Sequence, residues 1–270
     1  MGTAERMSTD YQIFQLNAFT DRVFSGGPAA VVPMEDFPED EVLRGIASDN
    51  NLSETAFTAP CDSDEADFHL RWFTPTVEVD LCGHATLATA ALYFSVLNWN
   101  RPVIRFLTRS GVLSIRKEAA GYAMDFPILP TLEPITAAPF PFVQAVSGPE
   151  FAIYELASST DVRTFTPDFA QIAGMHEEGI IITAKGDPAR GDTTDIVSRM
   201  FAPNIGIPED PVTGAAHCAL ATFWPQKLGK TTLTAEQASA RRGTLQLSLK
   251  GDRVELKGQA VLYLQGKITV

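Results

Sequence analysis

The sequence predicts an α/β (α+β) fold made of two pseudo-equivalent halves, and three observations support this prediction. The same order of short apolar strands and one glycine-led apolar helix occurs twice along the 270 residues. Short motifs recur at matched positions, since "RWFTP" (71–75) matches "RMFAP" (199–203), and "SETAFT" and "EEGIIIT" stand ahead of them. A proline-rich stretch separates the two series. Several matches in the same order indicate an ancient internal duplication.

The first half begins with the β-prone run "YQIFQLNAF", a Gly-Pro turn in "SGGPAAVV", a second strand and then a helix in "EDEVLRGIASDN". In that helix Val42, Leu43, Ile46 and Ala47 share one face. Two short strands, "ETAFTAP" and "FHLRWFTP", lead to an apolar helix from about His84 to Leu97. The strands "VIRFLT", "VLSIRK" and "YAMDF" complete this half.

The stretch "PILPTLEPITAAPFPF" (127–142) contains five prolines and is typical of a stiff connector. We therefore expect an N-terminal half at residues 1–128 and a C-terminal half at 129–270, with the last strand free to return to the first half. The second half repeats the order with "FAIYELA", a helix in "PDFAQIAG", and the strands "GIIITAKG" and "IVSRMFAP". The second glycine-led helix and the strands "LQLSLKG", "RVELKG" and "AVLYLQG" follow.

The composition excludes several classes of partner. The net charge of -12 opposes binding to nucleic acid and to anionic membrane surfaces. The longest apolar run, 85–97, is shorter than the roughly 20 residues of a membrane span, and the first ten residues lack the apolar segment of a secretory signal. The three cysteines have no CxxC spacing. We expect a cytoplasmic protein with reduced thiols and no structural zinc.

The two helix starts, "DLCGHATLATAALYF" (80–94) and "DPVTGAAHCALATFW" (210–224), suggest a binding site. A helix N-terminus exposes unpaired backbone N–H groups and partial positive charge, and a glycine there lets an anion approach closely. Two such starts related by pseudo-twofold symmetry should face one cleft between the halves. We therefore expect that backbone amides near Gly83 and Gly214 bind a small carboxylate.

Three ionisable residues are positioned for proton transfer: Glu54 in "LSETAF", His84 in "CGHAT" and Asp210 in "EDPVTG". Two of them, His84 and Asp210, sit at or before a helix start. Burial raises the pKa of a carboxyl group, whereas a helix N-terminus or an imidazolium lowers it. Such groups can act as general base or general acid. This proton transfer needs no metal and no organic cofactor.

The sequence resembles the phenazine-biosynthesis PhzF-like isomerases, which have the diaminopimelate-epimerase-like fold. The motifs that carry the resemblance are "AFTDRVFSGGPAAVV" (18–32), "LSETAF" (52–57), "RWFTPTVEVDLCGHAT" (71–86) and "EDPVTGAAH" (209–217). The resemblance implies two halves, each a mostly antiparallel sheet or barrel wrapped round a central helix, and a homodimer that needs no cofactor. It implies Glu54 as the main proton shuttle, with His84 and Asp210 as the other catalytic residues. The implied substrate-binding residues are Ser53, Gly83, Ala85, Gly214 and Ala215.

Two positions depart from the family pattern, and the substrate is therefore left open. Gly27 stands where many members have the asparagine of "GNPAAVV", and Ala215 stands where the phenazine enzymes have a serine. We also keep two alternative functions. A two-thiol racemase could use Cys82, although the second half has Pro211 and Val212 ahead of Thr213 and Gly214, and no thiol. A non-catalytic protein could keep the cleft only to bind a small molecule or a scaffold partner.

Four further residues are interpreted as structural. Arg71 and Arg199 lie at matched strand positions and should form ion pairs. His217 and Cys218 are adjacent on a helix and point to different faces, which argues against a shared metal ion.

Overall fold

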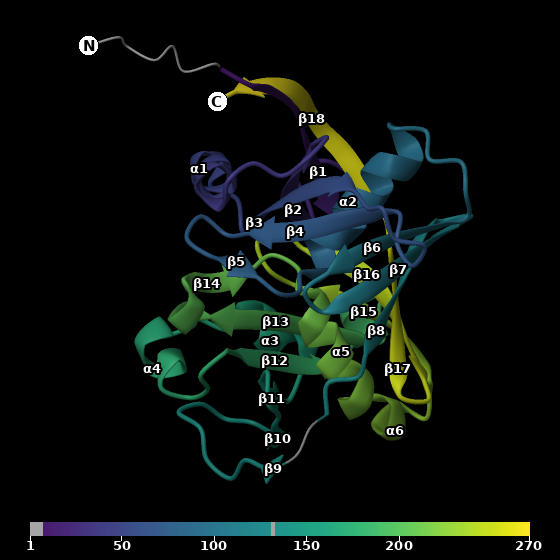
Figure 1. Cartoon of the computed structure of the whole chain (residues 1–270). Helices are drawn as coiled ribbons and strands as arrows, with labels where there is room; N and C mark the ends of the chain where they lie inside the picture. The colour runs from purple at the N-terminus through teal and green to yellow at the C-terminus, as the bar shows by residue number, and fades with distance from the viewer. Residues whose placement is uncertain (1–7, 131–132) are drawn as a thin grey trace.

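A computed structural model describes residues 8–130 and 133–270. It confirms the mixed α/β fold with two pseudo-symmetric halves (Figure 1). Residues 1–7 lie outside the described residues, and they make up most of the segment that is expected to lack a secretory signal. The boundary between residues 128 and 129 stays a prediction.

The first half has two parallel strand pairs, β2 with β3 and β4 with β6, while its other neighbouring strands are antiparallel. Its elements are β1 (Asp10–Ala18), β2 (Gly27–Pro33), α1 (Asp40–Asn50), β3 (Glu54–Pro60), β4 (Phe68–Phe73), β5 (Glu78–Val79), α2 (Gly83–Ser95), β6 (Val103–Thr108), β7 (Gly111–Glu118) and β8 (Gly121–Pro127).

The second half repeats this topology, because β11 pairs in parallel with β12 and β13 in parallel with β15, and β16 and β17 follow antiparallel. Its elements are β9 (Glu133–Pro134), β10 (Gln144–Ser147), β11 (Ala152–Glu155), α3 (Ser159–Thr164), α4 (Phe169–Ala173), β12 (Ile180–Lys185), η1 (Pro188–Arg190), β13 (Ile196–Ala202), η2 (Pro203–Ile205), β14 (Ile207–Asp210), α5 (Gly214–Phe223), α6 (Pro225–Leu228), β15 (Thr232–Gln237), β16 (Gly243–Lys250), β17 (Arg253–Gly258) and β18 (Ala260–Thr269).

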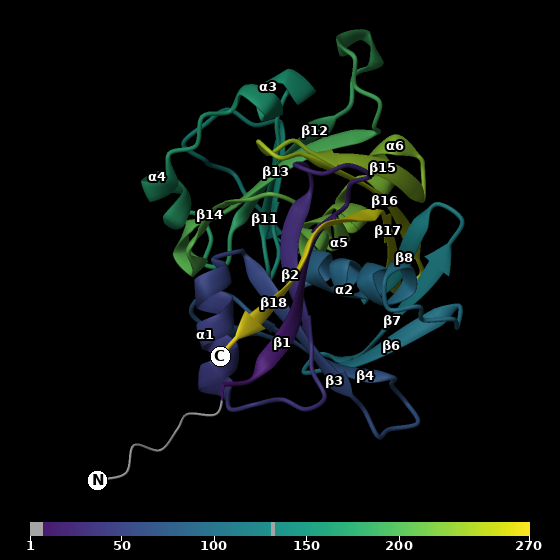
Figure 2. The same ribbon diagram turned by 90° about the horizontal axis from the view of Figure 1, so that it is seen from above.

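Two antiparallel pairings join the halves. Strand β17 pairs with β8, and the last strand, β18, pairs along β1 from Ala18 to Asp10. Figure 2 shows the yellow β18 beside the purple β1. The C-terminal strand therefore completes the sheet of the N-terminal half.

Helix α2 is the central helix of the first half. Every residue from His84 to Phe94 is buried, so the helix has no polar face, as expected for a helix enclosed by strands. It packs against β1, β2, β3 and β8. In contrast, α1 buries only Leu43, Ile46 and Ala47, which confirms its predicted apolar face.

Some elements were not predicted from the sequence. Strand β10, strand β15 and helix α3 are among them. Strand β15 spans "TLTAEQ", in which polar residues are frequent, and it is held between β13 and β16. Its place in the sheet depends on these neighbours more than on its own apolar content.

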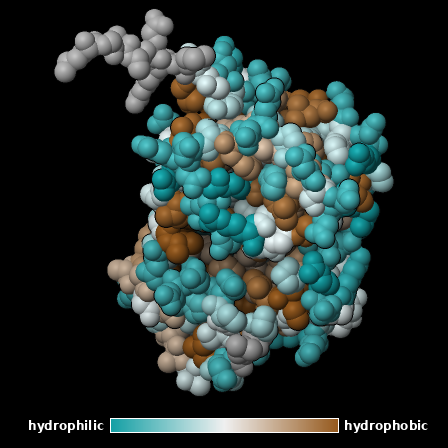
Figure 3. All heavy atoms as spheres, viewed as in Figure 1, coloured by the Kyte–Doolittle hydropathy of each residue, from teal (hydrophilic) through white to brown (hydrophobic). Residues whose placement is uncertain are grey.

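On the face drawn in Figure 3, hydrophilic residues cover most of the surface and apolar atoms gather around the hollowed middle. This hollowed part lies at mid-height in this view. In the part of the chain that the structure describes, no helix is long and apolar enough to cross a membrane.

Two arginines at matched positions form equivalent ion pairs, as predicted. Arg71 donates to Glu78 at 2.8 and 2.7 Å, and Arg199 donates to Glu209 at 2.7 and 3.0 Å. Each guanidinium also lies near the ring two residues later, 5.1 Å from the ring centre of Phe73 and 5.0 Å from that of Phe201. The duplication thus extends to side-chain contacts.

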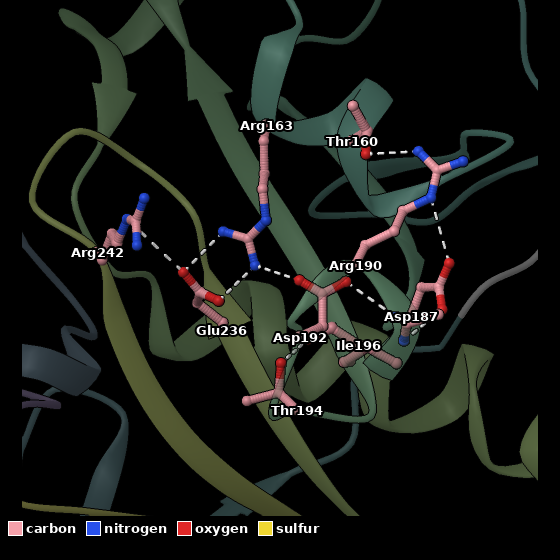
Figure 4. Close-up of polar contacts among 10 residues, drawn as sticks. Thr160, Arg163, Asp187, Arg190, Asp192, Thr194, Ile196, Glu236 and Arg242 are labelled. Atoms are coloured by element: carbon pink, nitrogen blue, oxygen red, sulfur yellow. Dashed lines mark hydrogen bonds and ion pairs between the residues drawn. The ribbon is translucent and has the colours of Figure 1, made fainter.

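A larger ion-pair network braces the second half (Figure 4). Arg163, on α3, donates to Glu236 of β15 at 2.9 and 2.6 Å and to Asp192 at 2.8 Å. Asp192 in turn accepts a hydrogen bond from the backbone of Asp187 at 2.8 Å. The network ties α3 and the segment after β12 to β15.

Candidate active site

The two glycine-led helix starts meet in the structure. Gly83 and Gly214 are the first residues of α2 and α5, and a Cβ atom built on Gly83 would lie 3.1 Å from the Cα of Gly214. Glycine suits this backbone approach, because a Cβ atom at that distance would require the neighbouring backbone to move. The preceding residues, Cys82 and Thr213, make no side-chain capping hydrogen bond. The backbone N–H groups of both first turns are therefore not capped by these side chains and could bind an anion.

Glu54 and His84 lie side by side at this junction. Glu54 begins β3 and is 8% exposed, and His84 is the second residue of α2 and is 4% exposed. Glu54 Oε2 and His84 Nε2 are 3.1 Å apart, which is close enough for an ion pair. Their alignment does not make a hydrogen bond, so both atoms are buried without a hydrogen-bond partner. We take the short distance as a Coulombic contact between groups that remain able to bind a ligand.

The imidazole of His84 is held on its other sides. Its Nδ1 lies 3.6 Å from Cys82 Sγ. Gly27 packs on the ring, since a Cβ atom at Gly27 would lie 3.2 Å from His84 Cδ2. These contacts keep Nε2 directed toward Glu54.

Three side chains of this cluster carry atoms that could bind a metal ion. Glu54, Cys82 and His84 each have a donor atom within 4.8 Å of the others. However, Glu54 faces Nε2 and Cys82 faces Nδ1, and the lone pairs of these two nitrogens point away from each other. One ion cannot reach all three donors without turning the ring, so the arrangement does not fit a three-ligand metal site.

Asp210 ends β14 and is held at the start of the second helix. Its Oδ2 accepts a hydrogen bond from Thr213 Oγ, whereas its Oδ1 is buried without a partner. Gln237 fixes this turn, because its amide donates to Asp210 O at 2.7 Å and accepts from Thr213 N at 2.8 Å. Asp210 stands four residues before Gly214, which contacts Gly83, so it belongs to the same helix-start junction as His84. The charges of His84 and Glu54 both act on its pKa.

Burial changes the protonation of this site. Burial raises the pKa of Asp210. The charge of Glu54 raises this pKa further, whereas the charge of His84 lowers it. Burial also raises the pKa of the Cys82 thiol, again reinforced by Glu54. Burial alone lowers the pKa of His84, but Cys82 and Glu54 raise it by more, so the pKa lies well above its ordinary value. The cluster thus favours a protonated imidazole beside a carboxylate.

The other predicted binding residues flank these groups. Ser53 is half-buried directly before β3, Ala85 is fully buried in the first turn of α2, and Ala215 is half-buried in the first turn of α5. Their roles in substrate binding stay predictions.

Two further residues that support the site were not predicted from the sequence as part of it. Gln237 lies on β15 and contacts the Asp210 turn from 27 residues away. His217 is buried in α5, as its structural interpretation suggested, and its Nδ1 lies 2.7 Å from Thr213 O, to which it donates. No local motif marks Gln237, because its partner is far away in the sequence.

Comparisons with known proteins agree with this geometry. The family model described as phenazine biosynthesis-like protein matches residues 16–266. An uncharacterized isomerase of Pseudomonas aeruginosa is 47% identical over 263 residues, covering 95% of this chain and 98% of the relative. A PhzF-family crystal structure from Enterococcus faecalis superposes with a TM-score of 0.90 at 37% identity, covering 97% of this chain and 100% of that one. A hydroxyproline epimerase from Agrobacterium vitis, at 9% identity and a TM-score of 0.68, shares the fold over 97% of this chain and 93% of its own.

Proposed function

The chain belongs to the phenazine biosynthesis-like protein family, with relatives named as isomerases, and we propose that it moves a proton on a small carboxylate-bearing metabolite without a cofactor. One observation carries the proposal. In the described part of the chain five buried side-chain polar atoms lack a hydrogen-bond partner, and three of them lie in this site: Asp210 Oδ1, together with Glu54 Oε2 and His84 Nε2, which contact each other only as an ion pair. An unpaired buried polar atom costs about 1–3 kcal/mol. A cluster of such atoms is therefore best explained by a ligand that pairs with them.

The chemistry follows from the positions of these groups. The substrate carboxylate accepts hydrogen bonds from the first turns of α2 and α5, near Gly83 and Gly214. The carboxylate of Glu54 removes a proton from one carbon and returns it to another, so the product is an isomer and no electrons are lost. His84, protonated beside Glu54, stabilises its negative charge. Asp210, with its pKa raised by burial, is suited to hold the second proton.

A cysteine racemase remains the second candidate, because Cys82 Sγ lies 3.6 Å from His84 Nδ1. Two facts weigh against it. Burial and the charge of Glu54 raise the pKa of Cys82, which opposes formation of the thiolate that a racemase needs. The matching residue before Gly214 is Thr213, which has no sulfur.

Hydrogen exchange with solvent tests the proposal. The protein is incubated in D2O with a panel of small carboxylic acids, and deuterium bound to carbon is measured by NMR or mass spectrometry. We expect incorporation into at least one compound, and Glu54→Gln should slow it by about two orders of magnitude or more. The matched control is Glu35→Gln, which alters an exposed carboxylate. Near-parental exchange in Glu54→Gln would remove this residue from the mechanism.

Cysteine substitution separates the two candidates. On the same compound, Cys82→Ser should keep most of the exchange and Asp210→Asn should lose most of it, with iodoacetamide treatment of the parent protein as a control. If Cys82→Ser and alkylation abolish exchange while Asp210→Asn leaves it intact, the racemase explanation replaces ours.

We also propose a cytoplasmic homodimer that does not bind nucleic acid. The negative net charge supports the last point, and the family resemblance supports the dimer. Light scattering after size exclusion would measure the mass, and a monomer at micromolar concentration would contradict the dimer.

A further inference from the structure

A small apolar hollow lies where the two helix starts meet. It has a volume of about 20 Å³, and its lining includes Leu81, Gly83, Phe126, Leu129 and Ala215. Leu81 is 37% exposed, whereas Phe126 is 3% exposed, so the hollow leads from the surface toward the interior.

The hollow shares a wall with the proposed carboxylate site. Gly83 directly precedes His84, and Ala215 directly follows Gly214. A carboxylate bound at these first turns would therefore have the rest of its molecule next to the hollow. Cys218 also lines the hollow, and its thiol is uncharged at neutral pH because burial raises its pKa to about 12.

Among the residues that the structure describes, the side chains lining the hollow offer no hydroxyl, amide or charged group to a ligand. Ala215 contributes only a methyl group to the wall. A volume of about 20 Å³ exceeds the roughly 10–15 Å³ needed for one water-sized group. The space therefore fits a methyl or methylene group, and a polar group placed there would lose its water without gaining a partner.

We infer that the substrate carries a hydrocarbon group beside its carboxylate and has no hydroxyl or ammonium group at that position. This inference rests on the proposed function, since it assumes that the carboxylate binds at Gly83 and Gly214. The apolar group lies against Leu81, Leu129 and Ala215.

Propionate, glycolate and glycine test the inference, because they have nearly the same shape and differ in a methyl, a hydroxyl and an ammonium group. Acetate serves as the reference. Binding to the intact protein is measured by NMR titration. We expect propionate to bind about fourfold more tightly than acetate, the gain for one buried methylene-sized group. Glycolate and glycine should bind about tenfold more weakly than propionate.

Ala215→Ser provides the matched variant, since it adds one hydroxyl to the wall. It should reduce the preference for propionate over glycolate severalfold, whereas Leu264→Ser, an exposed change on β18, should leave the preference unchanged. Glycolate or glycine binding as tightly as propionate in the parent protein would overturn the inference alone. If no carboxylate binds, including acetate, the proposed carboxylate site fails and the inference fails with it.

Discussion

His217 is a buried titratable group beneath the second helix start, and its protonation should limit the stability of the fold at low pH. Its side chain is fully buried and its Nδ1 donates to Thr213 O at 2.7 Å. Burial lowers the pKa of His217 to about 4, although the hydrogen bond to Thr213 opposes this effect. At neutral pH the folded protein therefore holds a neutral imidazole here.

The size of the effect follows from the difference between the two states. An unfolded chain has a histidine pKa of about 6.5. Between pH 6.5 and about 4 the unfolded state binds a proton at His217 and the folded state does not, so the free energy of unfolding falls as pH falls. At pH 5 this group should reduce that free energy by about 2 kcal/mol relative to pH 7, and the full loss should approach about 3 kcal/mol below pH 4.

His84 has the opposite sign, which makes a variant necessary. Its pKa is raised, so the stability it contributes is present below pH 6.5 and is lost as pH rises through the folded-state value. Urea unfolding of the parent and of His217→Asn at pH 7 and pH 5 separates the two groups. Asparagine keeps an N–H donor for Thr213 O but does not titrate.

The parent should lose about 2 kcal/mol more than His217→Asn between these two pH values. The same loss in both proteins would refute the reasoning, because it would show that His217 binds its proton equally in the folded and unfolded states.

Two other substitutions test the packing. Gly83→Ala puts a Cβ atom 3.1 Å from the Cα of Gly214, so it should lower the free energy of unfolding by about 1–3 kcal/mol and weaken acetate binding. Its control, Gly45→Ala, meets no atom within 4 Å in α1 and should be stabilising by about 0.5–1 kcal/mol; equal stability changes would contradict the account. Arg163→Met removes the guanidinium shared by two largely buried carboxylates, leaving Asp192 with the Asp187 N–H and Glu236 with Arg242 at 3.9 Å, and should cost about 1–3 kcal/mol by urea unfolding. Arg190→Met, at an exposed pair, should cost less than about 1 kcal/mol, and the reverse order would disprove the role of the network.

Local pattern was sufficient to predict the two-half fold. Helix α2 is mostly apolar, and the family resemblance implied a central helix in each half; the burial of every residue from His84 to Phe94 agrees with this for α2. The repeated "RWFTP" and "RMFAP" segments likewise predicted matched strands, and their arginines form matched ion pairs. Strand β15 was missed because its polar residues are compatible with a strand only between its two neighbours.

The site, like the fold, was predicted from the sequence only in part. The residue types beside the two helix starts mark His84 and Asp210 as candidates, because capping and charge at a helix end are local properties. Glu54 was identified from its motif "LSETAF". Only the tertiary structure decided that Gly83 touches Gly214, since that contact joins residues 131 positions apart and depends on how β8 pairs with β17. The hydrogen bonds between Gln237 and the Asp210 turn likewise depend on the tertiary structure, because Gln237 is distant in the sequence. Which helix starts share a cleft is set by strand pairing across the whole chain, and no segment contains that information alone.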